Sequence, residues 1–63
     1  MPATPERGYS AACAHLASHL GISLAAARRR VEIRAAREEL REVAARQALA
    51  ERMLEEAIAS GVD

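Results

Sequence analysis

The chain has 63 residues, a formal net charge of zero and one cysteine, so it forms at most one domain and no internal disulfide bond. It has one Tyr and neither Phe nor Trp, and its apolar residues are mostly alanine. Alanine favours helix but buries little area, so this composition predicts an all-α protein that needs a partner chain to complete its core. No apolar run reaches about 18 residues, and residues 1–7 lack a signal-peptide core, which predicts a cytoplasmic protein.

Charge is distributed unevenly along the chain. Residues 28–37 contain five arginines and one glutamate, a net charge of +4. Residues 38–63 contain seven acidic residues and three arginines, a net charge of −4. Such an asymmetry indicates an anionic partner for the middle of the chain.

The N-terminal part of the chain predicts a disordered arm followed by a short helix. Residues 1–8 contain two prolines and a glycine, which is typical of a poorly ordered arm. Ser10 is a suitable N-cap for the first helix, and Gly21 would end that helix in a left-handed conformation. Its buried face follows helical spacing and comprises Cys13, Leu16, Ala17 and Leu20.

The rest of the chain predicts one long helix. Residues 24–59 include no Gly and no Pro, and such a helix would be about 54 Å long. Arg34 and Glu38, four residues apart, would pair on its surface. The expected organisation is one helical domain over residues 9–63, with a helix-turn-helix-like part at 9–37 and an oligomerisation helix at 38–60. Whether the long helix bends near residue 37 stays open.

A heptad stripe on this long helix predicts self-association. Apolar residues recur at alternating spacings of three and four, with Gln47 as the single polar core position, and a short first helix could not cover so long a face. We therefore expect a homo-oligomer, in the first instance a dimer, with packing that is parallel, antiparallel or a four-helix arrangement. The expected interface residues are Ile33, Ala36, Leu40, Val43, Gln47, Ala50, Leu54 and Ala57.

The segment 17–23, ASHLGIS, resembles the core of the helix-turn-helix motif of DNA-binding proteins. In that motif a small residue such as Ala17 lets the second helix approach closely, and Gly21 takes the positive φ of the turn. Ile22 fills the corner and Ser23 caps the second helix. Later buried positions of the motif correspond to Ala27 and Val31.

The resemblance implies a recognition helix that begins at Leu24 and enters the major groove of DNA. Arginines on such a helix pair with guanine or contact phosphate. The chain departs from the motif at Arg30, where an apolar residue is usual, and no turn signal separates a third helix. The expected DNA-binding residues are Ser23, Ala25, Arg28, Arg29, Arg30 and Arg34.

No catalytic, cofactor or metal site is predicted. His15 and His19 are four residues apart on one helix, but zinc needs three or four ligands and the chain has no other histidine. Cys13 lies on the buried stripe without a base partner. The preferred hypothesis is a small transcriptional regulator that binds DNA and dimerises through its C-terminal helix. The alternative is a helical adaptor, antitoxin-like protein or inhibitor that binds another protein and no nucleic acid.

Overall fold

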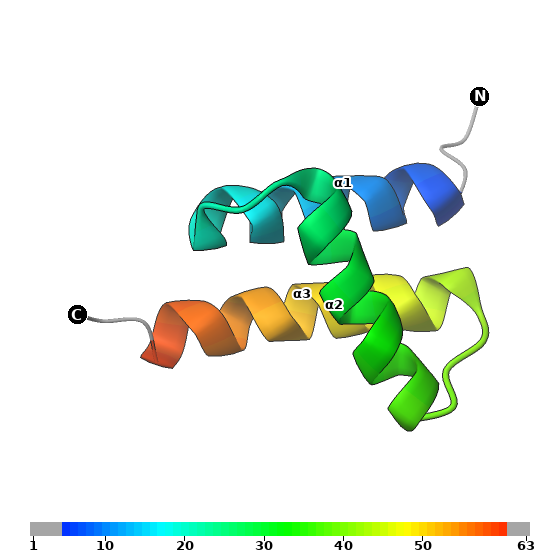
Figure 1. Cartoon of the computed structure of the whole chain (residues 1–63). Helices are drawn as coiled ribbons and strands as arrows, with labels where there is room; N and C mark the ends of the chain where they lie inside the picture. The colour runs from blue at the N-terminus through cyan, green and yellow to red at the C-terminus, as the bar shows by residue number, and fades with distance from the viewer. Residues whose placement is uncertain (1–4, 61–63) are drawn as a thin grey trace.

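The computed structural model describes residues 5–60, which form three helices and no strand within that range (Figure 1). These are α1 (Pro5–Leu20), α2 (Leu24–Arg37) and α3 (Val43–Ser60). α1 and α3 lie side by side and run in the same direction, and α2 crosses both of them (Figure 1). The predicted all-α class is confirmed.

The core lies where the three helices meet. Every buried side chain among the described residues belongs to the apolar group, and the largest fully buried ones are Leu16, Leu49, Val31 and Cys13. α1 and α3 approach closely near Gly8, where an added Cβ would lie 2.5 Å from the Gln47 side-chain oxygen. The remaining buried residues are mostly alanines, together with Tyr9: Ala12, Ala17, Ala27, Ala35 and Ala50.

The first helix begins earlier than the sequence indicated. α1 starts at Pro5, so Ser10 lies inside the helix, and residues 5–8 are not part of an arm. Proline is favoured at the first position of a helix, because its missing N–H is not needed there. The burial of Tyr9 also stabilises the added N-terminal part of the helix. Residues 1–4 of the expected arm lie outside the described residues.

The expected long helix is wrong, because the chain breaks between α2 and α3. Glu39 has a φ of 60°, the only positive value at a described non-glycine residue. The Leu40 N–H donates to the Ala35 carbonyl oxygen at 2.8 Å, and the Glu39 N–H donates to that of Ala36 at 3.2 Å. These two bonds form a Schellman motif, which ends a helix without requiring Pro. Leu40 then packs against the core, so burial overrides the local preference for helix.

The break divides the heptad stripe between two helices. On α2, Ile33 and Ala36 are exposed. On the other side of the break, Ala50 is fully buried within this chain, whereas Gln47 and Ala57 are half-buried. Beyond α2, the stripe's larger residues pack against the chain's own core: Leu40, Val43 and Leu54. Because α1 has 16 residues and α3 has 18, the first helix is long enough to cover most of this face.

None of the helices within residues 5–60 is alone long and apolar enough to cross a membrane. α1 and α2 pass that test together by length and composition, but they are bent by 111° at the break between them.

Candidate nucleic-acid interface

The corner between α1 and α2 is built by two local devices. Gly21 has a φ of 70°, and the Ile22 N–H donates to the Ala17 carbonyl oxygen at 3.0 Å. The Ser23 hydroxyl oxygen then accepts a bond from the Ala26 N–H at 3.1 Å and caps α2. The resulting bend of 111° lies within the range of about 90–120° that helix-turn-helix units adopt.

The residues that carry the resemblance occupy the buried positions that the motif requires. Ala17, Ala27 and Val31 are all buried. α3 is a third helix that packs against both members of the corner, although no Gly or Pro marks the turn before it. The departure at Arg30 remains, since this side chain is exposed and α2 contributes Ala35 to the core instead.

Two of the expected DNA-binding arginines are held by contacts within the chain. The Arg28 guanidinium carbon lies 5.3 Å from the centroid of the Tyr9 ring, and its Nε lies 3.7 Å from a Glu32 carboxylate oxygen. Arg34 bonds to Glu38 at 3.3 Å and to Glu56 at 3.2 Å. These carboxylates raise the pKa of Arg34 above its ordinary value. Both arginines are thus partly neutralised by carboxylates of the same chain.

The outward face of α2 points away from the core. We define it by Arg29, Arg30, Ile33, Ala36 and Arg37, all of which are exposed. Its three arginines make no ion pair with any residue of the described range 5–60. Ala25, the remaining expected contact residue, is exposed one turn before this face. Arg29 and Arg30 are among the expected DNA-binding residues, whereas Arg37 is not.

Tyr9 joins α1 to the basic helix through Glu32. The hydroxyl of Tyr9, a buried residue, donates to a carboxylate oxygen of the exposed Glu32 at 3.4 Å. Burial, followed by the nearby Cys13 and Glu32 groups, raises the pKa of Tyr9 to about 12. Burial also raises the pKa of the Cys13 thiol. Tyr9 and Glu32 are 23 residues apart, so no local sequence signal could have found this contact.

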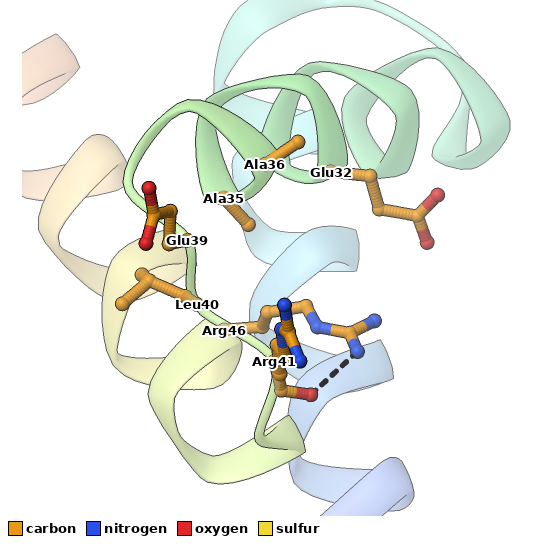
Figure 2. A pocket seen from close by; sticks show the side chains of 7 residues that line it. All are labelled: Glu32, Ala35, Ala36, Glu39, Leu40, Arg41 and Arg46. Carbon is orange, nitrogen blue, oxygen red and sulfur yellow. Dashed lines mark hydrogen bonds between the residues drawn. The ribbon is translucent and has the colours of Figure 1, made fainter.

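A pocket of about 430 Å³ lies beside the turn between α2 and α3 (Figure 2). The Arg46 side chain donates to the Arg41 carbonyl oxygen at 2.7 Å, while the Arg46 Nε is enclosed and has no hydrogen-bond partner among residues 5–60. Glu32 and Glu39 balance the two arginines, so the lining has no net charge that would select an anion or a cation. The apolar part of the lining is Ala35, Ala36 and Leu40.

Metal-binding clusters are absent from residues 5–60, where no group of three His, Cys, Asp or Glu side chains is close enough to hold an ion. His15 and His19 are both exposed on α1.

No curated protein and no solved structure matches this chain. A family model described as a domain of unknown function (DUF8658) matches residues 6–63, which include nearly the whole chain. The chain therefore belongs to the family that this domain of unknown function defines.

Proposed function

We propose that the protein is a small DNA-binding regulator in which α2 enters the major groove. One observation carries the proposal: after a corner of 111°, α2 presents an outward face whose only charges are three arginines without ion pairs in the described chain. Phosphate contacts by arginine supply most of the affinity of such proteins for DNA. An anionic duplex fits this face by charge.

The arginines of α2 have different parts in this proposal. Arg29 is the candidate for base contacts, since it is exposed near the start of the helix, and Arg30 and Arg37 are candidates for phosphate contacts. Arg28 contributes less, because DNA would have to compete with Glu32 for it. Ser23 acts through its hydroxyl as the cap of α2 rather than as a direct contact.

Fluorescence anisotropy with a labelled duplex of mixed sequence tests the proposal. We expect the wild type to bind, and we expect the double variant Arg29→Ala, Arg30→Ala to bind at least about tenfold more weakly, because each phosphate or base contact contributes about 1 kcal/mol or more. Arg41→Ala is the matched control. Arg41 is an exposed arginine outside α2, and its carbonyl contact to Arg46 survives the substitution. The affinity of this variant for the duplex should therefore stay close to that of wild type.

Two outcomes of this experiment contradict the proposal. One is a wild type that does not bind the duplex at about 50 mM salt, where electrostatic attraction is still weakly screened. The other is a double variant that binds as well as Arg41→Ala. Circular dichroism of each variant checks that the helices are retained.

A second candidate function is docking of α2 on another protein, and Ile33 favours it. This side chain is 49% exposed in the middle of the outward face. An apolar side chain does not bind phosphate, so phosphate binding does not explain its position. An amphipathic helix in an acidic groove would use both the isoleucine and the arginines. Ile33→Gln separates the two functions, because it keeps all charges: DNA affinity should be retained, whereas a groove that buries Ile33 would lose affinity.

A further inference from the structure

α3 has an outward face that is opposite in charge to that of α2. We define the outward face of α3 by exposed residues at successive spacings of four, three, four and three, which place them along one side of a helix. This side is opposite the buried Leu49 and Ala50. Glu55 makes no ion pair with any described residue, and Glu51 accepts a hydrogen bond only from the neutral Gln47. The face comprises Ala44, Ala48, Glu51, Glu55 and Ile58.

The two outward faces also match in length and apolar content. Each carries one exposed isoleucine, Ile33 at 49% and Ile58 at 54% exposure, and each includes at least one alanine. Helices of 14 and 18 residues are about 21 Å and 27 Å long, so α2 can lie along most of α3. Small residues allow two helices to approach closely, and the arginines would then meet the glutamates.

Within one chain these two faces cannot meet. α2 and α3 already contact each other through other positions, where Arg34 bonds to Glu56 and Arg52 bonds to Glu38. Those contacts hold the inner sides of the two helices together, so the outward faces point elsewhere. The partner with the required charge and shape must come from another molecule.

We infer that the outward face of α2 in one copy docks on the outward face of α3 in a second copy. Arg29, Arg30 and Arg37 then approach Glu51 and Glu55, and the exposed isoleucines lose contact with water. The association weakens as salt is added, because the attracting charges are exposed in the free chain. It does not depend on DNA binding, but any DNA that binds these arginines competes with the second copy.

Sedimentation equilibrium of charge-reversal variants tests this inference without DNA. The α2 variant is Arg29→Glu, Arg30→Glu, Arg37→Glu, and the α3 variant is Glu51→Arg, Glu55→Arg. Each variant alone sets like charges against each other, so we expect its self-association to be at least about tenfold weaker than that of wild type. An equimolar mixture restores opposite charges at both contacts, so we expect association to return.

Matched controls carry the same kind of charge change away from both faces. Arg41→Glu alters an exposed residue between α2 and α3, and Glu6→Arg alters an exposed residue on α1. Both variants should associate as the wild type does. Circular dichroism reports whether each variant keeps its helices. If the α2 variant does not fold, the uncharged substitutions Ile33→Gln and Ile58→Gln replace the test, and each should weaken self-association.

Three results would overturn the inference. The first is a wild type that stays monomeric up to about 1 mM at low salt, a concentration at which even weak association of about 4 kcal/mol is populated. The second is reversal variants that associate as well as the wild type. The third is a mixture of the two variants that fails to associate although the wild type does. None of these results bears on whether α2 binds DNA, which the duplex titration decides separately.

Discussion

The turns at Gly21 and Glu39 end their helices in the same way but with residues of very different conformational freedom. Both have a positive φ, 70° and 60°, and both are closed by a backbone bond that spans five residues, 3.0 Å long in the first turn and 2.8 Å in the second. Glycine adopts this conformation freely, whereas a glutamate does so at a cost of about 1 kcal/mol. The first turn is thus specified locally, and the second depends on the packing of the residues around it.

The contacts beside the two turns differ as well. α1 and α2 are joined by the buried Tyr9, whose hydroxyl bonds to Glu32. α2 and α3 are joined by exposed ion pairs, in which Arg52 bonds to Glu38 and Arg34 bonds to Glu56. Arg34 also bonds to Glu38. Hydrogen bonds from these two arginines lower the pKa of Glu38. The first junction should therefore be sensitive to high pH, whereas the second should be sensitive to salt and to low pH.

The largest predicted change in stability is the loss that high pH causes at the junction of α1 and α2. The pKa of Tyr9 is about 12 in the folded chain against an ordinary value of 10.0. The folded state therefore holds this proton more tightly than the unfolded state, and the free energy of unfolding falls as pH rises from about 10 to about 12, by up to about 2 kcal/mol. Urea unfolding across this range, with absorbance titration of the single tyrosine, measures both quantities.

Tyr9→Phe is the control for the pH prediction. The pKa of the buried Cys13 thiol is also raised, so its ionisation lowers the free energy of unfolding in the same direction. The variant will therefore keep some dependence of unfolding free energy on pH. The prediction fails if Tyr9→Phe has the same slope as the wild type between pH 10 and 12.

Gly21→Ala should cost less, about 1 kcal/mol of unfolding free energy. Nothing lies within 4 Å of a Cβ added at this position, so the cost comes only from the left-handed backbone and not from a clash. Chemical denaturation with unchanged m-value would measure it. A neutral or stabilising effect would show that the corner does not depend on glycine.

Glu39→Gly should have the smallest effect and the opposite sign. Glycine removes the strain at φ 60°, but it also increases the freedom of the unfolded chain, so we expect a net stabilisation of about 0.5 kcal/mol. Glu39→Asn tests the same conformation without glycine's entropy, since asparagine tolerates it. A loss of stability in both variants would contradict the proposed strain.

The sequence predicted the first half of the fold better than the second. The helical class, the turn at Gly21 and the Ser23 cap are visible locally, because glycine and serine have direct conformational meanings. The break at Glu39 was missed, because neither Gly nor Pro marks it and because the half-buried Leu40 after it packs against a core that residues far apart in the sequence build. The same break divides the heptad stripe, whose part from Leu40 onward is buried or half-buried within this chain.

Only part of the geometry around the candidate site could be predicted from the sequence. The exposed Arg29 and Arg30 and the pairing of Arg34 with Glu38 follow from helical spacing. The contacts that restrain Arg28 and Arg34 involve Tyr9 and Glu56 on other helices, and no local pattern encodes them.

The salt dependence of DNA binding tests the central claim most directly. For wild type and for the double variant Arg30→Ala, Arg37→Ala, which removes the two candidate phosphate contacts, the logarithm of the binding constant is measured against the logarithm of the salt concentration. Each lost phosphate contact lowers the magnitude of this slope by about 0.9, so two phosphate-contacting arginines should lower it by about 2. A decrease of about 2 in the magnitude of the slope, with the helices retained, supports α2 as the DNA-binding helix. An unchanged slope, or a wild type that does not bind, contradicts it.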